Sequence, residues 1–141
     1  MEISRTVIDA SFLLKLFLPE ERSDRAYEIW ASWIENSVEV AAPTLIMFEA
    51  PSVIRHKVHR NLLNEKDGAE IVDRMKRVDM TLVYTDDLLE SAWEIGRRLR
   101  ATALYDCFYL ALSQLLNAPL WTADKKLCQL AKGVVPALNL I

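Results

Sequence analysis

Two kinds of hydrophobic pattern alternate along the chain. Short runs of β-branched and apolar residues predict buried strands, and longer segments with apolar residues every three or four positions predict amphipathic helices. The predicted strands are residues 5–8, 38–42, 81–84 and 120–122, with a further edge strand at 134–135. The predicted helices are residues 11–18, 24–34, 44–59, 65–78, 86–100, 105–116 and 124–131. Strands that alternate with helices are typical of an α/β fold, so we expect a three-layer structure with a mostly parallel sheet of four to five strands.

Some residue types predict where these helices begin, bend or are buried. Ser23 and Asn64 are good helix caps, because their side-chain oxygens can accept hydrogen bonds from the free N–H groups of a first turn. Pro51 lies inside the segment 44–59, where its missing N–H and its ring should kink the helix or make it restart. The segment 105–116 is apolar nearly all round, which predicts a helix buried on most sides.

Composition limits the class of protein. The 141 residues are 52% hydrophobic and 26% charged, which excludes intrinsic disorder and predicts one domain over residues 1–141. Cys107 and Cys128 are too few for a disulfide framework, and with His56 and His59 they lack zinc-finger spacing. The N-terminus lacks the basic and apolar regions of a leader peptide, and no apolar segment predicts a membrane span. We therefore expect a cytoplasmic protein that does not contact membranes.

Three aspartates lie where a parallel sheet would bind a ligand. Asp9 ends the first predicted strand, and Asp124 comes just after the fourth. Ligands of open parallel sheets bind beyond the carboxyl ends of the strands, which share one edge. Asp106 begins the helix that leads into the fourth strand, so we expect it at the same edge.

Glu49 is a fourth acidic residue that we expect near this edge. It lies on the apolar side of the predicted helix 44–59, with Leu45 four residues before it and Val53 four residues after it. A buried carboxylate is costly unless a cation or hydrogen-bond donors compensate it. Magnesium prefers oxygen ligands, and a bound magnesium ion polarises phosphate oxygens and activates water. The four acids therefore predict metal-assisted phosphate chemistry.

Helix capping is the competing explanation for the aspartates. Asp9, Asp106 and Asp124 each lie at a predicted helix start, where Asp is a common cap, but capping does not explain Glu49. Ser11 and Thr122 carry hydroxyls near the same edge, which can orient a carboxylate or a water molecule. For Ser11 capping is the preferred interpretation.

The segments around these acids resemble the motifs of PIN-domain nucleases. The matching segments are Val7-Ile8-Asp9-Ala10-Ser11, Phe48-Glu49, the run from Tyr105 to Leu112 and the run from Thr122 to Leu127. Each motif is short, but the four occur in the family's order over nearly the whole chain, and the size is most similar to that of VapC toxins of toxin–antitoxin modules. The resemblance implies an endoribonuclease that depends on Mg²⁺ or Mn²⁺ and uses Asp9, Glu49, Asp106 and Asp124. It also implies a homodimer and a small antitoxin partner.

One segment departs from the family's pattern. Relatives often carry Glu, two small or apolar residues and then Asn on the second helix, whereas this chain reads Glu49-Ala50-Pro51-Ser52. A kink at Pro51 would shift Glu49 relative to the other acids.

An RNA substrate would need local basic surface, because the formal net charge is −3. Lys125 and Lys126 follow Asp124 directly, which favours them as RNA contacts, and Arg55 is a further candidate. Solvated helix faces are the preferred interpretation of two basic groups: Arg55 with Lys57 and Arg60, and the arginines at 97, 98 and 100.

Other functions compete with a nuclease. A phosphoacceptor receiver domain needs an acidic neighbour for Asp9 and a lysine where Asp124 stands, and a haloacid-dehalogenase-like phosphatase needs Asp at position 11. A PIN-like RNA-processing nuclease without an antitoxin fits the same acids. A catalytically weak PIN-like binding module also stays open because of Pro51.

Overall fold

Five parallel strands form one sheet in the computed structural model, which describes residues 4–141. The leader-peptide prediction rests partly on residues 1–3, which lie outside the described residues. The strands are β1 (Arg5–Ile8), β2 (Glu39–Pro43), β3 (Thr81–Val83), β4 (Leu120–Thr122) and β5 (Leu138–Leu140). The helices are α1 (Ala10–Lys15), α2 (Ser23–Glu35), α3 (Ile46–His59), α4 (Glu65–Met75), α5 (Asp86–Leu99), α6 (Tyr105–Leu116) and α7 (Lys125–Leu130). The predicted α/β class is confirmed, and the sheet is entirely parallel.

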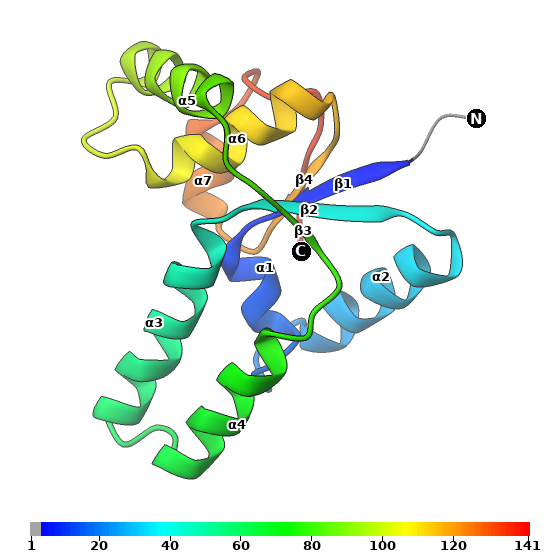
Figure 1. Ribbon diagram of the computed structural model, residues 1–141, viewed down its shortest axis with the longest axis vertical. Helices are drawn as coiled ribbons and strands as arrows, with labels where there is room; N and C mark the ends of the chain where they lie inside the picture. The colour runs from blue at the N-terminus through cyan, green and yellow to red at the C-terminus, as the bar shows by residue number, and fades with distance from the viewer. Residues whose placement is uncertain (1–3) are drawn as a thin grey trace.

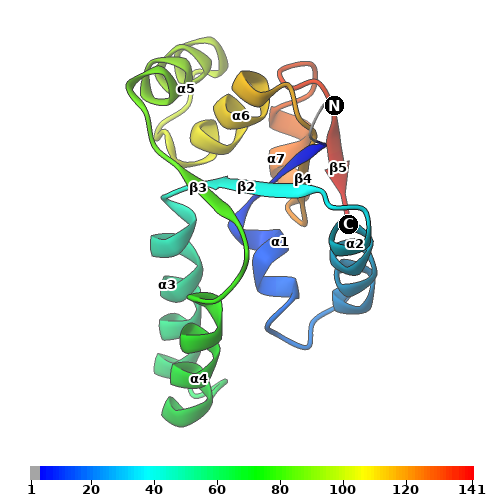
Figure 2. The same ribbon diagram turned by 45° about the vertical axis from the view of Figure 1, so that its right-hand side comes forward.

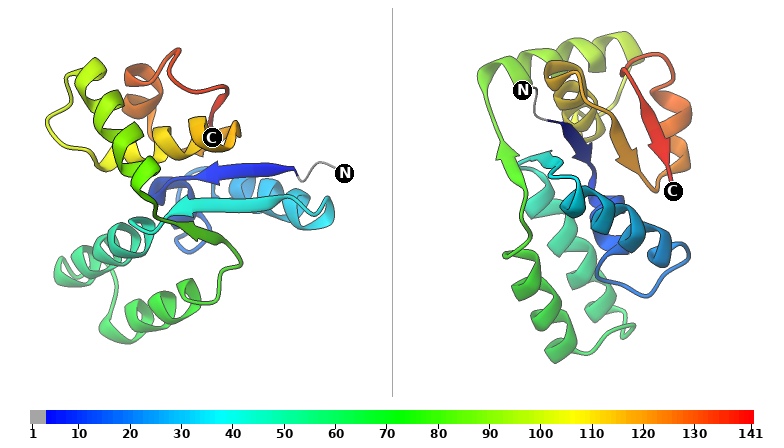
Figure 3. Two further views of the ribbon diagram at one scale, coloured as in Figure 1. Left: turned by 45° about the horizontal axis from the view of Figure 1, so that its top comes forward. Right: turned by 90° about the vertical axis from the view of Figure 1, so that its right-hand side faces the viewer.

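Helices cover both faces of the sheet (Figure 1). Helices α5, α6 and α7 lie on one face, and α1 to α4 lie on the other (Figure 3). Helices α3 and α4 form a hairpin that extends away from the sheet (Figure 2). No helix within residues 4–141 is long and apolar enough to cross a membrane.

The strand order creates a natural ligand-binding position. The sheet runs β3-β2-β1-β4-β5, so the chain builds outward from β1 to β3 and then returns to add β4 and β5 on the other side of β1. The order therefore reverses between β1 and β4, and open α/β sheets bind ligands beyond the carboxyl ends of strands at such a reversal. Val7 pairs with Leu120 and Ile8 with Trp121, which aligns the ends of these two strands.

Helix α6 is held in the core between the sheet and α5. Its Cys107 and its residues 109–113 are buried, as the nearly continuous apolar pattern predicts. A Cβ atom at Gly96 of α5 would lie 2.7 Å from Leu104 Cδ2, so glycine permits the close approach of α5 to the start of α6. Because α6 leads into β4, it runs against the strand direction and begins at the carboxyl edge.

Two predicted details are wrong. Val134 and Val135 do not form a strand, and the edge strand is Leu138–Leu140, which pairs with β4. Ser23 is not the cap of α2 but its first residue, and its hydroxyl donates to the Leu18 carbonyl. The Asn64 cap is confirmed, because its side chain accepts from the Asp67 N–H at 2.7 Å.

Helix α3 does not restart at Pro51. It is continuous from Ile46 to His59, with Pro51 at its sixth position. A proline there removes one helical hydrogen bond near the start of the helix, and packing of the buried residues Ile46, Ala50 and Ile54 holds the helix together. Glu49 therefore lies in the first turn of an unbroken helix.

Candidate active site

Asp9 lies at the carboxyl end of β1 and caps α1. Its Oδ1 accepts hydrogen bonds from the Phe12 N–H at 2.9 Å and from the Ser11 hydroxyl at 2.7 Å. Its Oδ2 accepts from the Thr122 hydroxyl of β4. Asp9, and not Ser11, is thus the cap of α1, so the capping interpretation of Ser11 is wrong.

The hydroxyls of Ser11 and Thr122 connect Asp9 to the segment that carries Asp124. Ser11 Oγ accepts from the Ala123 N–H at 2.9 Å, and Thr122 Oγ1 accepts from the Asp124 N–H at 3.0 Å. Each hydroxyl therefore donates its proton to Asp9 and accepts a backbone N–H from the β4–α7 connection. This arrangement fixes the β1 and β4 ends relative to each other.

Asp9 is costly to ionise in this position. Only 5% of the residue is exposed, and this burial raises the pKa of Asp9 to about 6. The hydrogen bonds from Thr122, Ser11 and the Phe12 N–H lower the pKa, and the negative charge of Asp124 raises it further. Burial is the largest of these effects.

Glu49 reaches the same edge from the first turn of α3. The Tyr109 hydroxyl of α6 donates to Glu49 Oε1 at 3.0 Å. Partial burial raises the pKa of Glu49, the hydrogen bond from Tyr109 lowers it, and the charges of Asp106 and Asp9 raise it. The fully buried stripe of α3 lies at Ile46, Ala50 and Ile54, so Glu49 lies beside this stripe and is half-buried.

Asp106 is the second residue of α6 and does not cap it. The N-cap is Leu104, which makes no side-chain capping bond. No hydrogen bond or ion pair to another residue of the 4–141 range engages the Asp106 carboxylate. Desolvation and the charge of Asp124 raise the pKa of Asp106. Capping therefore does not explain Asp106.

Asp124 is the cap of α7, two residues beyond the end of β4. Its Oδ1 accepts from the Lys126 N–H at 2.9 Å and from the Leu127 N–H at 3.3 Å. Capping accounts for these contacts, as it does for one of the contacts of Asp9. The position of Asp124 at the carboxyl edge follows from the β4–α7 connection.

The four acids come from four elements and influence one another electrostatically. The charge of Asp124 raises the pKa of both Asp9 and Asp106, and the charges of Asp9 and Asp106 raise the pKa of Glu49. No lysine or arginine in the described chain forms an ion pair with any of them. Within residues 4–141, no three Asp, Glu, His or Cys side chains are grouped closely enough to coordinate one ion.

The donor type of these residues, rather than their spacing, suits a hard divalent cation, because magnesium is usually bound through one or two carboxylates and completes its coordination with water. Such ions prefer carboxylate oxygens, and a site of neighbouring carboxylates without cationic partners has unbalanced negative charge that an ion would neutralise. Ser11 and Thr122 hold Asp9 in place, and Tyr109 holds Glu49. Tyr109 was not identified as a site residue from the sequence, although it lies one helical turn after Asp106, inside the family-like segment from Tyr105 to Leu112.

The three basic residues considered as RNA contacts lie on two different helices. Lys125 and Lys126 are exposed at the start of α7, directly after Asp124. Arg55 forms two hydrogen bonds of 2.9 Å with Glu65 of α4, and this pairing raises the pKa of Arg55. The Arg55 side chain thus points toward α4, within the α3–α4 hairpin.

A model of the PIN domain matches residues 6–133. The chain belongs to the PIN domain family. Among curated proteins, Ribonuclease VapC9 of Mycobacterium tuberculosis is 33% identical over 130 residues, which cover 92% of this chain and 94% of that protein. Ribonuclease VapC3 of Pyrobaculum aerophilum is 24% identical over 127 residues, covering 89% and 93%.

Solved structures share the PIN fold at lower identity. VapBC2 from Rickettsia felis, solved with a fragment of promoter DNA, superimposes with a TM-score of 0.72 at 11% identity and covers 96% of this chain and 98% of that chain. VapC20 from Mycobacterium tuberculosis, described as a toxin that cleaves the sarcin–ricin loop, gives a TM-score of 0.68 at 20% identity, covering 95% and 98%. Family membership argues against the receiver and phosphatase alternatives.

Proposed function

We propose that this PIN-domain protein is a metal-dependent endoribonuclease and the toxin of a toxin–antitoxin module. The observation that carries the proposal is the set of four carboxylates at the carboxyl edge of the sheet, each coupled electrostatically to at least one other and without a cationic partner among residues 4–141. The similarity to VapC ribonucleases over 92% of the chain supports RNA as the substrate.

Asp9, Glu49, Asp106 and Asp124 would hold Mg²⁺ or Mn²⁺. When bound, such an ion supplies an activated water and an electrophilic contact to a phosphate oxygen. The reaction is hydrolysis: a water oxygen bonds to phosphorus, one P–O ester bond breaks, and the departing sugar oxygen takes up a proton. Ser11 and Thr122 keep Asp9 oriented throughout, and burial of Asp9 excludes bulk water from that carboxylate.

We predict that cleavage of a mixed RNA pool stops when a chelator is added. Activity should return with Mg²⁺ or Mn²⁺ but not with Ca²⁺, because calcium accepts longer and looser coordination than the reaction requires. Cleavage products are measured on gels after metal readdition. Equal cleavage with and without chelator would contradict the metal-dependent mechanism, and a protein without cleavage under every condition would favour the binding-module alternative.

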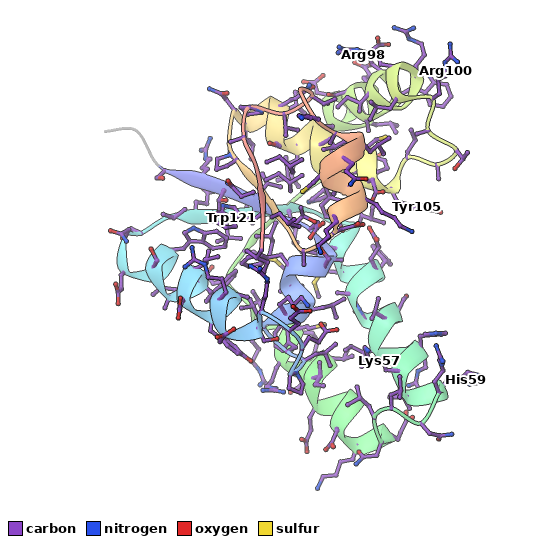
Figure 4. All side chains as sticks on the ribbon, turned by 180° about the vertical axis from the view of Figure 1, so that it is seen from behind. Lys57, His59, Arg98, Arg100, Tyr105 and Trp121 are labelled. Carbon is purple, nitrogen blue, oxygen red and sulfur yellow. The ribbon has the colours of Figure 1, made fainter. Side chains whose placement is uncertain are left out.

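Basic and aromatic side chains on one side of the molecule fit an RNA strand beside the site. Lys57, His59, Arg98, Arg100 and Tyr105 all project from one side of the molecule, whereas Trp121 lies away from that side (Figure 4). Tyr105 directly precedes Asp106, so this side includes the start of α6. Phosphates favour such basic surface, and an exposed aromatic ring offers a base a stacking partner.

We predict that the double variant Lys125→Ala/Lys126→Ala weakens RNA binding in metal-free buffer. The slope of log affinity against log salt should fall by about 0.7 for each lysine that contacts a phosphate of single-stranded RNA. Fluorescence anisotropy at several salt concentrations measures both quantities. Lys132→Ala is the matched control, because Lys132 is exposed beyond the other end of α7. The same loss in this control would mean a general charge effect.

We further infer a small antitoxin partner and a homodimer. The relationship to VapC proteins supports the partner, and solved relatives of the fold include a toxin–antitoxin complex from Klebsiella pneumoniae. Co-expression with the product of a short adjacent gene tests the first inference: the complex should co-purify and its RNA cleavage should be suppressed. Light scattering of the purified chain tests the second.

A further inference from the structure

The Tyr109 hydroxyl contacts the Glu49 carboxylate from the interior of the protein. Tyr109 is 2% exposed and lies in the core part of α6, where its hydroxyl donates to Glu49 Oε1 at 3.0 Å. It follows Asp106 by three residues, so both side chains lie on one side of the helix. Helix α6 therefore presents one acid directly and holds a second acid through a hydroxyl.

The hydroxyl has no other hydrogen-bond partner among the described residues. Burial of an unpaired hydroxyl is costly, and phenylalanine would fill the same core volume without that cost. A tyrosine here thus depends on the carboxylate for its hydrogen bond. Only one oxygen of Glu49 is engaged, which leaves the second oxygen for another ligand.

Helix α3 does not provide this support itself. Ser52 follows Glu49 by three residues, but its hydroxyl donates to the Phe48 carbonyl of its own helix at 2.7 Å. Among residues 4–141, the hydrogen bond from Tyr109 is the side-chain contact that orients Glu49.

We propose that Tyr109 is a positioning residue, whose hydroxyl holds Glu49 so that its free oxygen can bind the catalytic cation. The inference rests on the proposed metal-dependent function. It assigns to α6 a second role besides carrying Asp106.

The test is the Mn²⁺ affinity of the purified full chain, measured by electron paramagnetic resonance without RNA. Tyr109→Phe should bind Mn²⁺ about tenfold more weakly, as expected for loss of one hydrogen bond to a charged group. Glu49→Gln should weaken binding at least as much, and adding Tyr109→Phe to Glu49→Gln should cause little further loss, because the hydroxyl acts through Glu49. Tyr84→Phe is the matched control, since Tyr84 lies after β3, is 61% exposed and has no proposed role at the site.

A merely structural tyrosine gives a different result. If Tyr109 has only a structural role, Tyr109→Phe melts at a lower temperature than the parent but binds Mn²⁺ with the parent's affinity. That result would overturn the proposal. Losses that add fully in the double variant also overturn it. RNA cleavage by the parent is measured separately, so a parent that binds Mn²⁺ without cleaving RNA contradicts the proposed function while the variants still decide the role of Tyr109.

Discussion

Asp106→Asn should reduce RNA cleavage by about a hundredfold or more and leave the fold intact, because it removes one negative charge from a metal site. The carboxylate makes no hydrogen bond or ion pair with another described residue, and it does not cap α6. The folded state loses only the weak favourable interaction between a carboxylate and the start of a helix. At an exposed position such as that of Asp106, this interaction contributes about a few tenths of a kcal/mol. Single-turnover cleavage with Mg²⁺ measures the effect, and circular dichroism with thermal melting checks the fold.

Asp87→Asn is the matched control for this substitution. Asp87 is the second residue of α5, as Asp106 is of α6, and it is exposed. We expect this control to cleave RNA like the parent. If Asp106→Asn also cleaves at the parent rate, Asp106 does not belong to the catalytic site; if both variants lose activity equally, the effect is one of overall charge.

The order of elements was predictable because each element carries its own pattern. The bounds of α6 and β4 match those predicted, since α6 is apolar nearly all round and β4 lies between clear breaks. The edge strand β5 was missed because its position depends on pairing: Leu120 N–H donates to the Ala137 carbonyl, and Ile141 N–H donates to the Thr122 carbonyl. The β-branched pair at Val134 and Val135 gave a stronger local signal for a strand, but that segment is a turn.

The candidate site was predictable only as far as topology allows. The strand ends place Asp9 and Asp124, and the direction of α6 places Asp106, so the sequence pattern was sufficient to put these three at one edge. The Tyr109 contact with Glu49 joins residues 60 positions apart, and such a contact depends on how α3 packs near α6. The side-chain network around Asp9 likewise depends on the register between β1 and β4.

Asp9→Asn should stabilise the metal-free protein, because ionised Asp9 is buried at a cost. A pKa raised from 3.8 to about 6 means that folding favours the protonated acid, and this difference corresponds to about 3 kcal/mol at neutral pH. The amide keeps the capping bond to the Phe12 N–H but pairs less well with Ser11 and Thr122. We therefore expect a net gain of about 0.5–2 kcal/mol at pH 7.5.

This gain should depend on pH with a definite sign. A raised acid pKa destabilises the fold fully above the folded value of about 6 and not at all below the unfolded value of 3.8. The advantage of Asp9→Asn should therefore shrink as the pH falls from 7.5 to 5, where about half of the cost of ionisation is gone. Denaturant unfolding at both pH values measures the change.

Magnesium should stabilise the parent more than Asp9→Asn. A cation bound by the native site and not by the unfolded chain stabilises the parent, whereas the variant lacks one charged ligand and gains less. Asp87→Asn is again the control, with no gain in chelator and the magnesium shift of the parent. A cap alone behaves differently, because Asn caps a helix about as well as Asp and the cap does not respond to magnesium. If Asp9→Asn melts no higher than the parent in chelator and shows the same magnesium shift, the four acids do not share one metal site.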